Sequence, residues 1–273
     1  VENYSEAIRG LTDGGADISR VAVEAVAKSL RSTVEEGKLA DLQEALDKWT
    51  EDSSRGLVKD LPPLVDDAVL VLLSSLYVQQ GWAEEPDFSL IDFHPAGGEV
   101  SVTPGMAWDN ISVRRGDSYD YAVVPFADNL QFDVLMPTSG DLANLSVTDW
   151  DVKPDATMKV ELPQLKLVGE ANVSQMLENL SLTSIKNVPS AITGFTENGE
   201  GLVPEVIVQK ATLTLNQEGI EAAAVTQIQA VPTMLPVAEP DVLTFDHPFV
   251  FRVTDKESGW VLFYGAVNNP NPQ

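Results

Sequence analysis

The amino-acid sequence predicts an α+β fold with large mixed β-sheets, and three observations support this fold class. Apolar side chains recur at helical spacing through residues 1–60. From residue 66 onward, short strand-like runs alternate with clusters of turn residues. Strands and helices do not alternate strictly along the chain, which disfavours a purely parallel sheet. With 273 residues, 44% of them apolar, the chain is long enough to bury a sizeable core.

The helices are expected mainly at the start of the chain. Apolar residues repeat every three to four positions from Ile18 to Val34 and again from Leu39 to Trp49. Helical spacing returns once more in residues 172–185. We therefore expect helices packed around the sheets.

The strands expected after residue 66 begin with the most apolar one. Residues 68–78 form a nearly continuous Val- and Leu-rich run, which is typical of a strand buried on both faces. Strands are expected to dominate again from residue 205 to the end. Between these regions, shorter strands are expected at residues 100–102, 111–113, 121–125, 130–136 and 158–162.

The composition excludes several classes of function. The formal net charge of −25 argues against binding to nucleic acids and to anionic membranes. The absence of cysteine excludes disulfides, thiolate metal sites and cysteine catalysis, and it leaves the cellular compartment open. No cofactor is expected, and no apolar run is long enough to cross a bilayer. The balance of 17 basic against 42 acidic residues fits either simple solubility or adaptation to salt.

Catalytic and metal chemistry find little support in the sequence. His94 and His247 are the only histidines, and no Gly-x-Ser-x-Gly motif accompanies them. The acidic residues Asp109, Asp117 and Asp120 lack the spacing of a calcium loop and are expected in solvated turns. All five tryptophans are expected to anchor the core rather than to form a ligand cage, namely Trp49, Trp82, Trp108, Trp150 and Trp260.

The most informative stretch runs from residue 216 to residue 253. An apolar strand at residues 211–215 leads to Gly219, where we expect a sharp backbone turn. A tract of small residues follows, and then a loop that contains Pro232, Pro236 and Pro240. Because proline fixes φ and lacks an amide donor, this loop is expected to be extended and exposed. The small residues would nevertheless allow the segment to be buried.

Residues 220–231 fit two local structures. As a strand, one face would carry only small or apolar side chains, and the other would carry the charged and amide side chains. As a helix, Ile220, Ala224 and Ile228 would align on one face, and alanine is the best helix former. Both interpretations stay open.

Several ordered motifs together resemble the serpin family of protease inhibitors. Residues 245–251, Phe-Asp-His-Pro-Phe-Val-Phe, are similar to the signature strand that follows the family's reactive loop. Residues 259–270 resemble its C-terminal strand pair. Residues 46–61 resemble the helix that crosses the main sheet, and residues 70–82 resemble the central strand with its tryptophan. The match runs from about residue 40 to residue 270, and residues 1–39 show no counterpart of the family's N-terminal helices.

The resemblance implies one serpin-like domain over residues 1–273, with an exposed reactive-centre loop at about residues 217–244. It implies an inhibitor of serine-type endopeptidases rather than an enzyme. The protease would cleave the loop and be trapped when the hinge inserts into the main sheet. The hinge would comprise Glu218, Gly219, Ile220, Glu221, Ala222, Ala223 and Ala224. The alternative is a non-inhibitory member whose loop is cleaved as a substrate or serves as a binding surface.

The family register, counted from Gly219, places the cleaved bond between Thr233 and Met234. A small recognition residue suits proteases of elastase or subtilisin type, whereas a shift of recognition to Met234 or Leu235 would suit chymotrypsin-like enzymes. Arg and Lys are absent near this bond, which disfavours trypsin-like targets. A monomer is expected. Residues expected to contact the protease are Ala230, Val231, Pro232 and Leu235.

Three positions depart from the family pattern. Ser74 stands where the family usually has Asn, and Gln209 stands where it usually has His. The resemblance assigns both positions to the polar cluster that controls opening of the sheet, and both side chains can still form hydrogen bonds. Ile220 stands where inhibitory members usually have Thr or Ser. Its bulk is expected to slow insertion, which would favour substrate turnover over trapping.

Overall fold

A computed structural model gives the arrangement of two compact units, which are described one at a time. The first unit comprises residues 1–78 and 168–212, and the second comprises residues 79–167 and 213–273. The structure describes residues 4–12, 20–30, 33–36, 39–56, 58, 63, 70–146, 149–150, 152–173, 176, 179, 181, 208–220 and 241–270. None of the helices in these ranges is both long and apolar enough to span a membrane.

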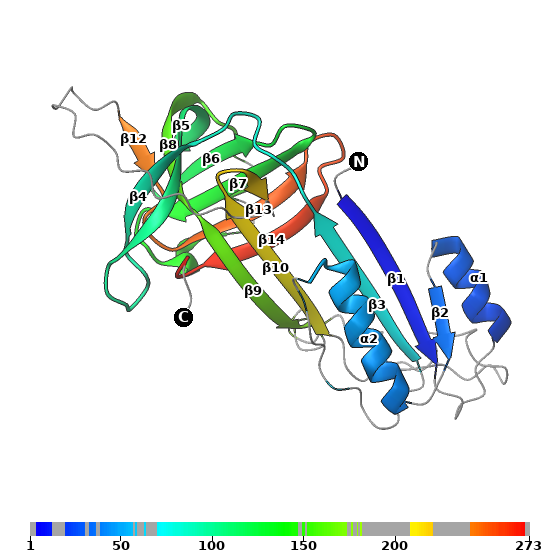
Figure 1. Cartoon of the computed structure of the whole chain (residues 1–273). Coiled ribbons are helices and arrows are strands. Elements are labelled where there is room, and N and C mark those ends of the chain that lie inside the picture. Colours follow the sequence, from blue (N-terminus) through cyan, green and yellow to red (C-terminus); the bar gives the residue numbers. More distant parts are fainter. Residues whose placement is uncertain are drawn as a thin grey trace. The chain divides into compact units, whose positions relative to one another are not determined.

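The first unit contains a three-stranded sheet with two helices beside it (Figure 1). The central strand β1 (Tyr4–Thr12) pairs antiparallel with β3 (Leu70–Val78) and parallel with β2 (Thr33–Glu36). Helix α1 (Arg20–Leu30) contacts β1 and β2, and helix α2 (Leu39–Ser53) contacts β3. The sheet therefore combines parallel and antiparallel pairing, as the predicted fold class requires.

The helical prediction for residues 1–60 is only partly correct. Helices form at residues 20–30 and 39–53, but residues 4–12 and 33–36 are strands. The partner of β1 is β3, and their register joins Tyr4 to Val78. Such a distant partner leaves no local pattern in the sequence, because tertiary pairing overrides intrinsic preference. The strand predicted at residues 68–78 is confirmed as β3, whereas its burial on both faces stays a prediction. Residues 172–185 lie largely outside the described residues.

The second unit is built on an eight-stranded sheet (Figure 1). The strand order is β12-β8-β5-β6-β7-β13-β14, and β4 also pairs with β5. Only the β12–β8 pair is parallel in this sheet. The strands are β4 (Asp87–Phe93), β5 (Ser101–Arg115), β6 (Tyr119–Pro125), β7 (Leu130–Pro137), β8 (Ala156–Pro163), β12 (Val242–Thr244), β13 (Phe249–Asp255) and β14 (Val261–Val267).

Strand β5 joins two strands that the sequence predicted separately. It runs for 15 residues and shifts its register against β8 between Trp108 and Ile111. A bulge of this kind lets one strand change direction without ending, so two short apolar patterns belong to one element. The strands predicted at residues 121–125, 130–136 and 158–162 are confirmed as β6, β7 and β8. A short 3₁₀ helix, η1 (Leu142–Asn144), follows β7 and is capped by the Asp141 side chain.

A third sheet has the order β11-β10-β9. It consists of β9 (Leu165–Asn172), β10 (Val208–Asn216) and the two-residue strand β11 (Gly219–Ile220). Strands β3 and β10 therefore belong to different sheets. The predicted α+β class with large mixed sheets is confirmed.

The core of the second unit is rich in aromatic side chains. Trp82 and Trp108 are buried, as predicted, together with the fully buried Phe93, Phe126, Phe132, Phe245 and Phe249. Trp260 contradicts the prediction, because its side chain is 68% exposed in the turn before β14. Asp120 also differs from its predicted solvated turn. It is buried in β6, where Arg115 contacts its carboxylate over 3.5 Å. Burial raises the pKa of Asp120, and the Arg115 guanidinium partly offsets this rise.

Candidate functional site

The candidate site begins where β10 ends in a tight hairpin. Asn216 pairs with Gly219 across a two-residue turn, and Leu215 pairs with Ile220. The Asn216 side chain closes the turn, because the backbone N–H of Glu218 donates to Asn216 Oδ1 over 3.0 Å. The chain therefore reverses after β10 and starts a new strand that runs antiparallel to it.

Gly219 meets two requirements that only glycine satisfies. Its φ is +128°, a backbone conformation that residues with a Cβ rarely adopt. A Cβ at this position would also collide with the carbonyl oxygen of Gln80 and would lie 2.8 Å from Gly81 Cα. The sharp turn predicted at Gly219 is therefore confirmed, and the structure adds the close approach of a second backbone as its reason.

Ile220 lies between two backbones and pairs with both of them. Its N–H donates to the Gln80 carbonyl over 2.9 Å, and the Gln80 N–H donates to the Ile220 carbonyl over 3.3 Å. On its other side Ile220 pairs with Leu215 of β10. The Ile220 side chain is only 2% exposed. The uncut chain thus accommodates the bulk of Ile220 in a buried, doubly paired position.

A cluster of aromatic rings holds the end of β10 in place. The indole N–H of Trp82 donates to the Asn216 carbonyl over 2.8 Å, and both groups are buried. The Trp82 ring stacks on Phe126 with centroids 4.5 Å apart, and its edge contacts Trp108 at 4.9 Å. Because a buried indole N–H needs an acceptor, the Asn216 carbonyl fixes the position of the hairpin relative to this core.

Gln80 connects the hairpin to a further turn of the second unit. The Gln80 side-chain amide donates to Asp128 Oδ2 over 3.0 Å, and Lys256 Nζ donates to the Asp128 carbonyl over 2.6 Å. Asp128 lies in the turn between β6 and β7. Reasoning from the sequence missed Gln80, Asn216 and Asp128, because their partners lie far along the chain and leave no local signal.

Strand β12 anchors the chain just after residue 240. Val242, Leu243 and Thr244 pair in parallel with Lys159, Val160 and Glu161 of β8, in that order. The Phe245 N–H then donates to the Glu161 carbonyl over 2.9 Å, and the Phe245 side chain is fully buried. Both ends of the segment 221–240 are thus attached to ordered strands.

Most of the predicted site residues lie outside the described residues. Ser74 is part of β3 opposite Ile8, and Gln209 is part of β10, but only their backbones are described. Of the predicted hinge, Gly219 and Ile220 lie against Gln80, and Glu218 forms the turn with Asn216. Outside the description are Glu221, Ala222, Ala223, Ala224, Ala230, Val231, Pro232, Thr233, Met234 and Leu235.

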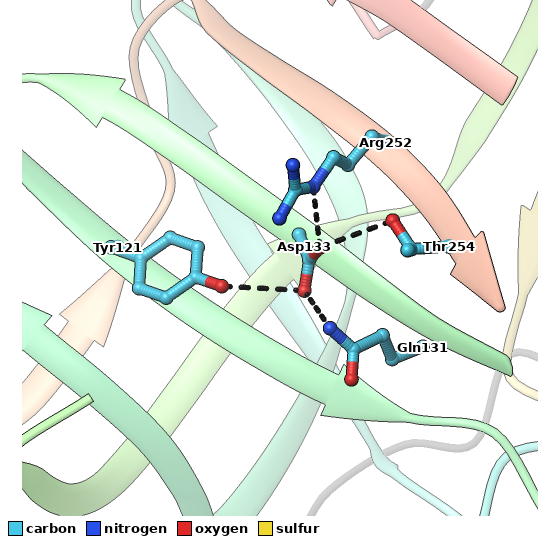
Figure 2. A network of polar contacts seen from close by, with 5 residues as sticks. All are labelled: Tyr121, Gln131, Asp133, Arg252 and Thr254. Atoms are coloured by element: carbon cyan, nitrogen blue, oxygen red, sulfur yellow. Dashed lines mark hydrogen bonds and ion pairs between the residues drawn. The ribbon is translucent and has the colours of Figure 1, made fainter. Parts of the chain in front are cut away.

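A buried ion pair joins the neighbouring strands β7 and β13 (Figure 2). Asp133 is fully buried and accepts from Arg252 Nε over 2.6 Å. Gln131, Thr254 and Tyr121 also donate to its carboxylate, at 2.7, 3.2 and 3.4 Å (Figure 2). The carboxylate charge is therefore compensated by one cation and three neutral donors, as a buried charge requires.

This network has two further consequences. The Arg252 guanidinium lies 4.6 Å from the centre of the Trp150 ring, a cation–π contact at the edge of the network. Burial of Tyr121 and the negative charge of Asp133 together raise the pKa of the Tyr121 hydroxyl well above its usual range. The network thus keeps Tyr121 neutral and Arg252 oriented, and it had no signal in the sequence.

Comparison with known proteins supports the resemblance seen in the sequence. A family model described as Serpin (serine protease inhibitor) matches residues 20–270, so the match begins earlier than residue 40. Alpha-2-antiplasmin from Bos taurus is 28% identical over 249 residues, which covers 83% of this chain and 48% of the relative. The solved structure of mouse protein Z-dependent protease inhibitor superimposes with a TM-score of 0.80 at 16% identity, covering 98% of this chain and 74% of that chain.

A further solved structure has the same fold. A serpin from Arabidopsis in its native stressed conformation gives a TM-score of 0.75 at 23% identity, covering 98% of this chain and 76% of that chain. The chain spans about half the length of the curated relatives it matches, with 48% and 58% of two of them covered. Since the family model extends over nearly the whole chain and the sheets match those of solved members, the chain belongs to the serpin family.

Proposed function

We propose that this chain inhibits serine proteases by trapping them as suicide substrates. The protease cleaves the loop between Thr233 and Met234, and the hinge then inserts as a new strand beside β10. The observation that carries this proposal is the position of Ile220, which is buried and paired on both sides before any cleavage. A strand that has already begun needs only a released end to continue.

The pairing of Ile220 supplies a register for the inserted strand. If both ladders continue without a bulge, Ala222 faces Leu213 and Val78, and Ala224 faces Ala211 and Leu76. Because alternate residues of a strand share a face, these alanines follow the buried side chain of Ile220. The alternation of small and polar residues in the sequence agrees with this register.

The same register explains why three polar residues occur where they do. Thr226 falls opposite Gln209 on one side and opposite Ser74 on the other. The side chains of Thr, Gln and Ser each carry both a hydrogen-bond donor and an acceptor. The three side chains in this row can therefore form hydrogen bonds with one another across the inserted strand. We therefore keep Ser74 and Gln209 as the residues that control sheet opening, with Thr226 as their partner after insertion.

Insertion should release a large free energy. About twelve new ladder hydrogen bonds at roughly 1 kcal/mol each contribute on the order of 10 kcal/mol. For a protein of this size, a gain of that magnitude raises the melting temperature by roughly 20 °C. A chain nicked in the loop should therefore melt well above the intact chain.

The test is incubation with pancreatic elastase and with subtilisin, followed by a denaturing gel and by melting of the nicked protein. Trapping predicts a covalent band at the summed mass of the inhibitor and the protease. Mass spectrometry should show that the released fragment begins at Met234. The matched control is Ala224→Pro, which removes a ladder donor from the middle of the inserted strand. This variant should be cleaved at the same bond but should give neither the covalent band nor the rise in melting temperature.

The alternative is a non-inhibitory serpin whose loop is only a substrate or a binding surface. The departures at Ser74 and Gln209 favour this alternative, because they change the polar residues that are expected to control opening of the sheet. A solved structure with a similar fold, the complex of thyroxine-binding globulin with thyroxine, contains a bound ligand. It superimposes on this chain with a TM-score of 0.76 at 15% identity. Complete cleavage of the wild-type chain without a covalent band and without a gain in melting temperature would establish the alternative.

A further inference from the structure

The only two histidines of the chain stack on each other in the second unit. The imidazole centroids of His94 and His247 are 4.9 Å apart, and the ring planes differ by 11°. His94 directly follows β4, whereas His247 lies in the connection between β12 and β13. The stack thus joins two segments that are far apart in the sequence.

Backbone contacts hold the two rings at this junction. The backbone N–H of His94 donates to the Asp246 carbonyl over 2.7 Å. The Asp246 carboxylate contacts His247 Nδ1 over 2.6 Å. A Cβ placed on Gly140 would lie 3.5 Å from His247 Cδ2, so the turn after β7 also packs against this ring. Three separate segments therefore meet at His247.

The junction also determines where β12 is held. The aromatic rings of Phe245 and Phe249 flank the connection on its buried side, with centroids 6.1 Å apart, and Phe93 contacts Phe249 at 6.5 Å. On the exposed side, the connection is held to the end of β4 by the histidine stack and the His94–Asp246 hydrogen bond. Because β12 has only three residues of its own, its stability depends on these flanking contacts.

Protonation changes the charge of this junction. Imidazole side chains gain a positive charge between about pH 8 and pH 5, and both rings are accessible to water because His94 is exposed and the His247 side chain is 44% exposed. One proton is compensated by the Asp246 carboxylate, which contacts His247. A second proton places two like charges 4.9 Å apart, which weakens the stack.

The other charged residues of the surrounding segments are mostly acidic. The exception on β8 is Lys159, which pairs with Val242 of β12 and whose ammonium group lies 3.8 Å from the Glu161 carboxylate. Asp92 and Glu99 belong to the hairpin of β4 and β5, and Asp141 follows Gly140, where its carboxylate accepts from the Ala143 N–H over 3.0 Å. The carboxylate in direct contact with the pair is that of Asp246.

We propose that the His94–His247 stack is an acid-sensitive latch that fastens the connection after β12 to the end of β4. The latch is closed when at most one ring is charged, and it opens when both rings are protonated. This inference goes beyond the proposed function, because it concerns the attachment of β12 and does not depend on whether a protease is trapped.

The test is hydrogen exchange of the peptide 241–249 at pH 7.5 and at pH 5.5, corrected for the intrinsic change in exchange rate. In the wild-type chain, protection should fall on the order of five-fold at the lower pH, as expected for two partly solvated charges at this separation. In His94→Gln, which cannot form the second cation, protection should be the same at both pH values. The peptide 130–137 from β7 serves as the internal control. An equal fall in both proteins would overturn the proposal.

A second measurement needs no variant. NMR cross-peaks between the two imidazole rings should be present at pH 7.5 and lost at pH 5.5. Cross-peaks that persist at pH 5.5 would overturn the latch, even if the His94→Gln variant failed to fold. Both readouts are separate from the covalent band that tests inhibition, so failure of one proposal does not imply failure of the other.

Discussion

At the scale of single residues, the geometry of the hairpin after β10 depends on the absence of a side chain at Gly219. Gly219 turns the chain out of β10 with a φ of +128° and lies against the Gln80 backbone. Ile220 can form hydrogen bonds to Gln80 only because this approach is possible. The pairing of Ile220 with two backbones is therefore specified by glycine at position 219.

Replacing Gly219 with alanine should disrupt the hairpin after β10 and its pairing with Gln80. The new Cβ would collide with the Gln80 carbonyl and would also force an unfavourable φ, so we expect a loss of about 3 kcal/mol in the free energy of unfolding. Urea denaturation measures this loss. The control is Gly97→Ala, where φ is +71° but nothing lies within 4 Å of the added Cβ, and where about 1 kcal/mol is expected. Equal losses in the two variants would show that the close approach of Gln80 does not matter.

Tyr121 makes the stability of the protein sensitive to alkaline pH. Burial and the Asp133 charge raise its folded-state pKa, whereas an unfolded tyrosine ionises near pH 10. The contribution of Tyr121 is therefore complete below about pH 10 and is lost as pH rises above it, because the unfolded chain releases a proton that the folded chain retains. Tyr121→Phe should show a shallower decline in the urea midpoint between pH 9 and pH 11. Tyr264→Phe, at a side chain that is 63% exposed, should decline like the wild type, and matching curves for all three proteins would contradict this account.

At the scale of elements, a buried ion pair connects β7 to β13. Arg252 and Asp133 are direct cross-strand partners, and the carboxylate has no access to water. Such a pair contributes little compared with well-packed apolar residues, but its disruption is costly because one charge remains buried without its partner. The network in Figure 2 therefore stabilises the pairing of β7 with β13 mainly because removal of one charged partner would leave the other buried without compensation.

Arg252→Met should measure this penalty. The variant leaves the Asp133 charge uncompensated, so we expect a destabilisation of about 3–5 kcal/mol in urea denaturation. Arg114→Met is the matched control, because the Arg114–Asp155 pair is 4.0 Å long and its side chains are 47% and 60% exposed. Its loss should cost less than about 1 kcal/mol. Adding Asp133→Asn to Arg252→Met should recover part of the stability, and a further loss on this addition would show that the charge was never the source of the penalty.

The elements also show which features could be predicted from the sequence. The turn at Gly219 and the strand β3 leave strong local patterns, and the sequence predicts both correctly. Strand β1 was missed because its partner β3 lies in a distant part of the chain. The Gln80–Ile220 pairing was missed for the same reason, since neither residue carries a motif of its own. Local reasoning predicts the turn at Gly219, but only three-dimensional pairing shows that Ile220 already forms a short strand with Leu215 and Gln80.

At the scale of the whole molecule, the excess of negative charge opposes folding. A formal net charge of −25 produces self-repulsion that is larger in the compact state than in the unfolded chain. The acidic side chain of Asp128 accepts a specific hydrogen bond from Gln80, but most of the 42 acidic residues cannot be paired with the 17 basic ones. The two interpretations of this composition, solubility and salt adaptation, differ in what salt should do.

Salt adaptation predicts that sodium chloride stabilises the protein in a particular concentration range. The screening length falls from about 30 Å at 0.01 M to about 3 Å at 1 M, so repulsion between surface carboxylates is largely removed over this interval. The melting temperature should therefore rise by several degrees up to about 1 M and then level off. A rise that continues linearly to several molar would instead indicate exclusion of salt from the protein surface. A melting temperature that does not change below 1 M would mean that the charge serves solubility alone, because the folded state would then carry no measurable repulsion for salt to relieve.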